Sequence, residues 1–198
     1  MFQTRTGGIS SLTCLGRVDV HGNATQLGDT EWSTEDNGNP GNMTEFTRDF
    51  LGQDNIMFII ERNLNRNVCY YTLDLESSRV IPTWLIIPDG VDVSDMSIDD
   101  VEEVTEERLT MLENRVYGVD TIDDSHFVVR ALKGAVFTIR RDGDSARATI
   151  EVDNRTWVLN RIMIHTTPSR LLGIPSVTEI HLDVEDENGK IVQFFFAT

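Results

Sequence analysis

Three short β-favouring runs, separated by turns, lie between Asn55 and Ile87 and constrain the fold more than any other stretch. The first run covers residues 55–61, the second covers 68–74 and the third covers 79–87. Asn-containing turn residues separate the first two runs, which predicts a hairpin, and the third run follows at once. Three adjacent strands can form a sheet with one buried face. Pro82 cannot donate a hydrogen bond to a ladder, so the third strand is predicted to have an edge position or a bulge.

The C-terminal half continues with a succession of predicted strands. They cover residues 125–132, 135–141, 145–152, 155–165, 176–184 and 190–196, and Lys133-Gly134 predicts a two-residue hairpin. Strands at such regular, short spacing are typical of an antiparallel β-sandwich or open barrel. We therefore expect one mainly β domain over residues 53–198.

Five aromatic side chains in these runs are candidates for a common core, because their strands must bury one face together. They are Phe58, Tyr70, Trp84, Phe137 and Trp157. In the longest run, Trp157 and Leu159 can share a face with Ile162 and Ile164 only if a bulge intervenes, since side chains alternate along a strand.

A strongly acidic segment interrupts the predicted strands. Residues 89–107 contain nine acids and no base. Ser97, the acids that follow it and the spacing of apolar residues up to Val116 predict a covering helix at about 98–117, ended by Gly118. The periodicity is imperfect and allows a break near Val104-Thr105. A calcium loop is not indicated, because Asp92, Ser94 and Met96 do not place oxygen ligands at alternate positions.

Residues 1–52 are predicted to be an N-terminal extension, an extended arm followed by a short helix at 43–52. Residues 1–42 are rich in Gly, Asn, Ser and Thr, and their few apolar residues form no continuous face. The arm either wraps its own domain or lies on a partner. We favour the partner, and then expect little regular structure, few contacts with residues 53–198 and unchanged domain stability when residues 1–42 are deleted.

The charge of the chain limits its partners. With 33 acids against 17 Lys and Arg, the net charge is −16. This balance argues against direct binding of nucleic acid or an anionic membrane surface through a broad basic face. The acidity serves solubility, or docking onto a basic partner. No apolar stretch approaches the length of a membrane span, so no span is expected.

The start of the sequence gives weak indications of compartment. It lacks the continuous apolar core of a secretory signal, which favours an intracellular location, cytoplasmic or cytoskeletal. Residues 1–18 contain Arg5, Arg17 and no acid, which resembles a mitochondrial transit peptide and leaves that compartment as the alternative.

No pattern of catalytic or metal-binding residues emerges. The sequence has no Gly-x-Ser-x-Gly elbow, phosphate loop or dinucleotide fingerprint. Its two cysteines lack the spacing of a zinc site, and its four histidines, His21, His126, His165 and His181, lie far apart along the chain. We therefore predict no catalytic, cofactor-binding or metal-binding residues, no cofactor, and a protein that is not an enzyme.

Several short motifs are similar to those of a known family. Phe58-Ile-Ile-Glu-Arg62 is followed by Asn65-Arg-Asn-Val-Cys-Tyr70 and then by Pro82-Thr-Trp-Leu-Ile86. This order resembles the family named domain of unknown function 4833, in which a strand ends in arginine, an Asn-rich turn precedes Val-x-Tyr, and a Tyr-Trp-Ile signature follows. Here Thr83-Trp84-Leu85 replaces the first and last residues of that signature.

The resemblance continues through Val116-Tyr-Gly118, the Lys133 hairpin and Val158-Leu-Asn-Arg-Ile162, and covers about residues 55–196. It implies no catalytic residue. Three hypotheses about function remain. The first is a non-catalytic structural or protein-interaction subunit of a larger assembly, which docks through its N-terminal arm. The second is a β-barrel module that holds a small apolar ligand, and the third and weakest is an unrecognised enzyme.

Overall fold

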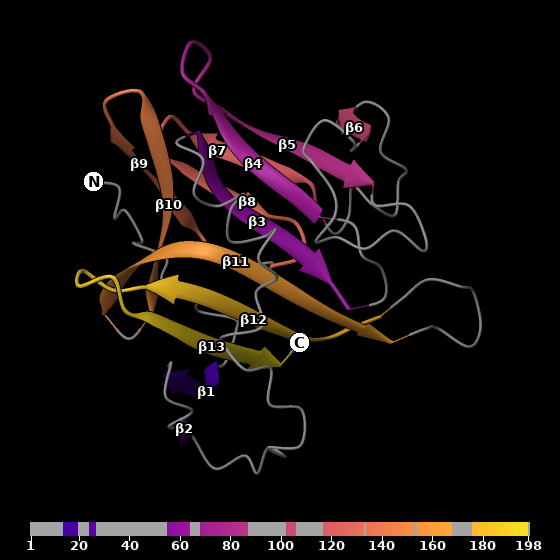
Figure 1. Ribbon diagram of the computed structural model, residues 1–198, viewed down its shortest axis with the longest axis vertical. Coiled ribbons are helices and arrows are strands. Elements are labelled where there is room, and N and C mark those ends of the chain that lie inside the picture. The colour runs from indigo at the N-terminus through magenta and orange to yellow at the C-terminus, as the bar shows by residue number, and fades with distance from the viewer. Residues whose placement is uncertain are drawn as a thin grey trace, which may run out of the picture.

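The computed structural model describes residues 55–63, 68–86, 117–132, 134–152, 154–167 and 176–197, and the backbone of 14–19, 24–26 and 102–105. Within these ranges the chain is mainly β, as predicted (Figure 1). The strands are β1 (Cys14–Asp19), β2 (Ala24–Gln26), β3 (Ile56–Arg62), β4 (Val68–Asp74), β5 (Arg79–Ile86), β6 (Glu102–Thr105), β7 (Val119–Asp123), β8 (His126–Val129), β9 (Phe137–Asp142), β10 (Ser145–Val152), β11 (Arg155–Thr167), β12 (Ser176–Glu185) and β13 (Ile191–Ala197).

All of these strands belong to one branched sheet, and the long strand β11 is the branch point. One edge of β11 pairs with β12, which continues through β13 and β1 to β2. The other edge of β11 pairs first with β10 and then, in parallel, with β3. One branch continues from β10 through β9 and β8 to β7, and the other continues from β3 through β4 and β5 to β6.

The two branches curve toward each other and enclose the core. Figure 1 shows β3, β4 and β5 beside β7 and β8, above the layer formed by β11, β12 and β13. Strands β5 and β7 lie close together, although no ladder joins them in the described part of the chain. The sheet is therefore a nearly closed barrel, extended on one side by β12, β13, β1 and β2.

Aromatic rings fill the middle of the barrel. Phe58 stacks on Tyr71 with ring centroids 4.3 Å apart, and Phe127 and Phe137 lie 5.7 and 6.3 Å from the Phe58 ring. Four of the five predicted core aromatics, Phe58, Trp84, Phe137 and Trp157, are buried in one cluster. Tyr70 is the exception, because β4 turns Cys69 and Tyr71 inward and Tyr70 toward the other face, opposite Ile59.

The bulge expected in the longest strand is present. The register of β11 against β12 shifts between Leu159 and Arg161. The extra residue returns the alternation to the core, so that Trp157, Leu159, Ile162 and Ile164 all lie in the buried cluster. As a consequence, Arg161 points to the opposite face of the sheet.

Pro82 also has the position that its missing N–H predicts. Strand β5 pairs with β4 along its full length, but with β6 only from Thr83 onward. Residues 79–82 therefore form a free edge among the described strands, and the ladder with β6 starts directly after the proline.

The predicted helix at about 98–117 is wrong over Glu102–Thr105. These residues form β6, which pairs with the C-terminal half of β5. Hydrogen bonds to the open edge of β5 outweigh the helical spacing of the apolar residues here. The strand includes Val104 and Thr105, where the sequence allowed a break in the helix, and both residues are β-branched and therefore favour strands. Tyr117 is helical in backbone conformation, and the remainder of that segment lies outside the described residues.

The expectation that the arm has little regular structure is wrong over Cys14–Asp19 and Ala24–Gln26, which are strands. Strand β1 pairs antiparallel with β13, and β2 pairs with β1. This part of the arm is extended, as predicted, but it joins the sheet of its own chain. Deleting residues 1–42 would uncover the edge of β13, so we now expect such a deletion to lower stability. The predicted helix at 43–52 lies outside the described residues.

The hairpin predicted at Lys133-Gly134 is wider than two residues. Strand β8 ends at Val129 and β9 begins at Phe137. Between them, the N–H groups of Leu132 and Ala135 donate to the carbonyl oxygens of Val129 and Leu132, while Lys133 itself lies outside the described residues. Gly134 has a φ of 98°, which explains why glycine stands there. Strand β7, which the sequence did not predict, pairs with β8.

Candidate functional site

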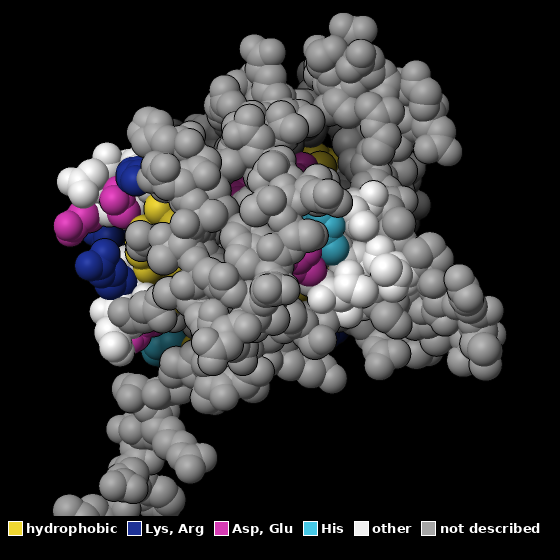
Figure 2. Space-filling view, turned by 90° about the horizontal axis from the view of Figure 1, so that it is seen from below, with side chains coloured by type: hydrophobic (Ala, Val, Ile, Leu, Met, Phe, Trp, Pro, Cys, Tyr) yellow, Lys and Arg dark blue, Asp and Glu magenta, His cyan; other side chains and the backbone are white. Residues whose placement is uncertain are grey.

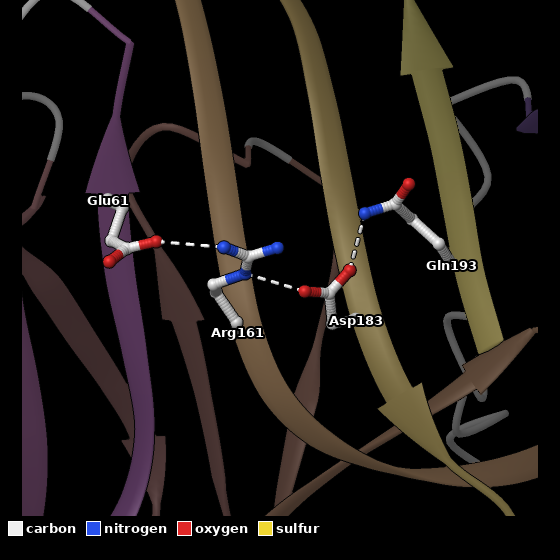
Figure 3. A network of polar contacts seen from close by, with 4 residues as sticks. All are labelled: Glu61, Arg161, Asp183 and Gln193. Atoms are coloured by element: carbon white, nitrogen blue, oxygen red, sulfur yellow. Dashed lines mark hydrogen bonds and ion pairs between the residues drawn. The ribbon is translucent and has the colours of Figure 1, made fainter. Parts of the chain in front are cut away.

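The most extensive polar cluster of the described residues crosses four neighbouring strands on the face opposite the aromatic core. Arg161 on β11 donates from Nη1 to Glu61 Oε2 on β3, 3.0 Å away, and from Nε to Asp183 Oδ2 on β12, 2.5 Å away. Gln193 on β13 donates from Nε2 to Asp183 Oδ1 at 2.6 Å. Figure 3 shows the four side chains in one row, with Arg161 between the two carboxylates.

The centre of this row is shielded from water. The side chains of Arg161 and Asp183 are 7 % and 3 % exposed, and that of Glu61 is 15 % exposed. Burial lowers the pKa of Arg161, but the charges of Asp183 and Glu61 outweigh this and raise the pKa above its ordinary value. The guanidinium therefore stays charged, and the row links β3, β11, β12 and β13 through their side chains as well as their backbones.

A second group of polar side chains lies on the same face, further along β11 and β12. The rings of His165 and His181 are 4.3 Å apart, and His181 also packs edge-on against Phe195 at 4.4 Å. His181 Nε2 lies 3.2 Å from Glu179 Oε1. The close approach of His181, with a further effect of the charge on His165, holds the pKa of Glu179 below its usual value.

A third cluster lies on the core side of β3. Arg62 follows Phe58 and Ile60 on the inward face, and its guanidinium carbon is 6.0 Å from the centre of the Tyr117 ring. The Tyr117 ring meets Trp84 edge-on at 4.0 Å, and the Tyr71 hydroxyl donates to the Tyr117 carbonyl oxygen at 2.6 Å. Arg62 Nε is buried and has no hydrogen-bond partner in the part of the chain that the structure describes.

Sequence reasoning predicted no site residues, so these clusters were missed as sites. The family-like motifs nevertheless contain several of their members: Glu61, Arg62, Trp84, Tyr117 and Arg161. The signal that could have found the row is Arg161, which lies between the apolar residues Leu159 and Ile162 in the β11 run, since a buried charged residue needs a partner. The His165–His181 contact follows from the β11–β12 register, which the sequence did not predict.

Within the ranges that the structure describes, no group of three or more His, Cys, Asp or Glu side chains could hold a metal ion. Cys69 is buried, and burial raises the pKa of its thiol to about 12. A search of the same residues for a helix long and apolar enough to cross a membrane finds none.

These features define a β-rich, barrel-like domain whose sheet is tied together by a buried row of charged and polar side chains. The chain belongs to the family described as domain of unknown function (DUF4833), whose model matches residues 58–193. The match begins within β3, ends within β13 and includes all the strands between them in the sequence. No curated protein and no solved structure shows a significant match to the chain.

Proposed function

We propose that this chain is a non-catalytic structural or protein-interaction subunit of a larger assembly, and that it docks through its N-terminal arm. The observation that carries the proposal is the pairing of arm residues Cys14–Asp19 with β13. Among the described strands, the arm forms the outer end of the sheet on this side, since β1 is followed there by just the three-residue strand β2.

The outer strands of a sheet offer unpaired N–H and C=O groups to another chain. In this sheet the pairing between β2 and β1 covers only Gly16 to Val18, so part of β1 is left without a strand on that edge among the described residues. A partner strand that continues the ladder gains main-chain hydrogen bonds without any special side chain. The arm therefore supplies both a link to its own barrel and an edge for the partner.

The charged residues also fit a structural role. The Glu61–Arg161–Asp183–Gln193 row satisfies its charges internally, by ion pairs and hydrogen bonds between strands. On the face shown in Figure 2, described Lys and Arg side chains lie beside Asp and Glu side chains, with both signs close together. A mixed surface suits a protein partner better than a polyanion such as nucleic acid.

The alternative hypothesis, a barrel module that holds a small apolar ligand, stays a prediction. The stacked rings of Phe58, Tyr71, Phe127 and Phe137 occupy the middle of the barrel. An apolar ligand would have to displace them, which makes this the less favourable use of the fold. The compartment and the absence of enzymatic activity likewise stay predictions.

The proposal is tested by comparing tagged full-length chain with a variant that lacks residues 1–42, both expressed in the native cells. We expect the full-length chain to co-purify with a stoichiometric protein partner and the truncated chain to lose it. Because truncation also uncovers β13, the matched control is Val192→Ala on β13, which weakens the core but keeps the arm. Loss of the partner in the control as well, or its retention by the truncated chain, would contradict docking through the arm.

A further inference from the structure

Two adjacent serines in the turn between β4 and β5 face opposite charges. Ser77 Oγ donates to Asp74 Oδ2 at 2.5 Å, whereas Ser78 Oγ accepts a hydrogen bond from Arg141 Nη2 at 2.7 Å. Arg141 lies near the end of β9, so this contact joins the two branches of the sheet. Figure 1 shows the turn at the end of the β4–β5 hairpin, where it projects beyond the neighbouring strands.

Ser78 has a backbone conformation that glycine usually supplies. Its φ is 57°, in the left-handed region, and the four other described residues with positive φ are three glycines and an asparagine. Glycine would fit this position with less strain, so the hydroxyl is the group that a serine adds here. That hydroxyl is the one that Arg141 reaches from 63 residues further along the chain.

The charge of Arg141 can receive an anion at this point. Among the described residues its guanidinium forms no ion pair, and its bond to Ser78 uses one of five N–H donors. Arg79 follows Ser78, is exposed and adds a second positive charge, although it lies opposite Asp74 in the ladder. A phosphoryl group on Ser78 Oγ would bring about −1.5 to −2 charges and three acceptor oxygens to these donors. On Ser77 the same group would lie beside the Asp74 carboxylate and be repelled.

We infer that Ser78 is a phosphorylation site, and that the phosphoserine pairs with Arg141 and ties the β4–β5 hairpin to the end of β9. The phosphoryl donor is a nucleoside triphosphate bound to a protein kinase. The bond from its γ-phosphorus to the bridging oxygen breaks and the bond from Ser78 Oγ to that phosphorus forms. The hydroxyl proton passes to a base of the kinase, and the nucleoside diphosphate leaves.

The turn is open to such an enzyme, because residues 75–77 and 79 on either side of Ser78 are exposed. The inference does not depend on the proposed role of the arm.

The first part of the test locates the phosphate. The full-length chain is incubated with an extract of its native cells and γ-labelled ATP, and the peptide that contains residues 77 and 78 is analysed by mass spectrometry. We expect label on Ser78, at least tenfold less label in the same peptide of Ser78→Gly, and undiminished label in the matched control Ser77→Ala. Glycine suits the positive φ of Ser78, so Ser78→Gly keeps the turn.

The second part tests the pairing with Arg141. Phosphoserine is incorporated during synthesis of the full-length chain at position 78 or, as the matched control, at position 77. Phosphoserine at 78 should raise the thermal midpoint by about 2–4 °C, because it adds an ion pair between the two hairpins. Phosphoserine at 77 should not raise the midpoint, and Arg141→Gln should abolish the gain at 78.

Three results would overturn the inference. The first is an incubated chain without phosphate on Ser78. The second is label that persists undiminished in the peptide of Ser78→Gly. The third is phosphoserine at 78 that stabilises the chain no more than phosphoserine at 77, or equally in the presence of Arg141→Gln.

Discussion

Replacing Arg161 with methionine is the sharpest test of the polar row, because it removes the one positive charge between two carboxylates. The substitution leaves the side chain of Asp183, only 3 % exposed, with the hydrogen bond from Gln193 as its remaining polar side-chain contact among the described residues. Breaking a buried ion pair by removing one partner costs about 3–5 kcal/mol of folding free energy. We therefore expect Arg161→Met to lower the free energy of unfolding by about 3–5 kcal/mol near pH 7.

The double variant Arg161→Met with Asp183→Asn isolates the cause. It removes both the buried cation and the buried anion, so it should recover about 1 kcal/mol or more relative to Arg161→Met alone. The surface pair Arg130–Asp120, with side chains 33 % and 57 % exposed, is the control. Arg130→Met should cost no more than about 1 kcal/mol.

The assay is urea unfolding followed by circular dichroism and by tryptophan fluorescence, with coincident transitions required before free energies are compared. Two results would refute the reasoning. The first is an Arg161→Met variant as stable as Arg130→Met. The second is a double variant whose loss of unfolding free energy equals the sum of the losses in Arg161→Met and in Asp183→Asn, each measured alone. Either would mean that the charges in the row do not stabilise one another.

Three further predictions follow from the core, the histidine pair and the buried thiol. Trp157→Ala should lower the free energy of unfolding by about 3–5 kcal/mol in urea titrations, because the residue is 5 % exposed and its ring packs on Phe194, whereas a loss below about 1 kcal/mol would place Trp157 outside the core. The pKa of Glu179 is lower in the folded than in the unfolded chain, so the folded state binds fewer protons and stability is lost as the pH falls below about 4.5. Glu179→Gln should flatten this loss in thermal melts between pH 5 and 3, and an unchanged slope would contradict it. In a Cys14→Ser background, Cys69 should react with a thiol reagent at pH 8 only as fast as the protein opens, because burial raises its pKa to about 12 and covers it; immediate labelling of folded protein would count against this.

The sequence predicted elements that form by local contacts. The runs 55–61, 68–74 and 145–152 became strands with nearly the expected bounds, because each has its own β-favouring side chains and its own turns. The bulge in β11 was also predictable, since only a shift of one residue can place Trp157 and Ile162 on the same face.

Elements that depend on distant partners were not predictable in this way. Strand β7 is mostly exposed and acidic, and it is a strand because β8 pairs with it. Strand β6 lies in a segment whose apolar residues have helical spacing, and it is a strand because it pairs with the open edge of β5. The parallel pairing of β3 with β11 joins residues about a hundred positions apart and has no local signal.

The candidate sites depend on the same long-range pairing. Glu61, Arg161 and Asp183 meet only because β3, β11 and β12 are neighbours, so a list of charged residues in the sequence could not reveal the row. Arg62 and Tyr117 were both visible as parts of family-like motifs, but their contact arises from the way β7 begins beside β5. Side-chain alternation within a run likewise could not decide whether Tyr70 or Tyr71 faced inward, because both adjacent positions are tyrosine.

The measurement that tests the proposed role most directly is the native mass of the endogenous protein, determined by size-exclusion chromatography with light scattering of a gentle cell extract. A single chain has a mass of 22.4 kDa. A subunit that docks through its arm should elute in a complex well above that mass, together with its protein partner. Elution of the endogenous protein as a free chain of about 22 kDa, under conditions that preserve known complexes, would contradict the account.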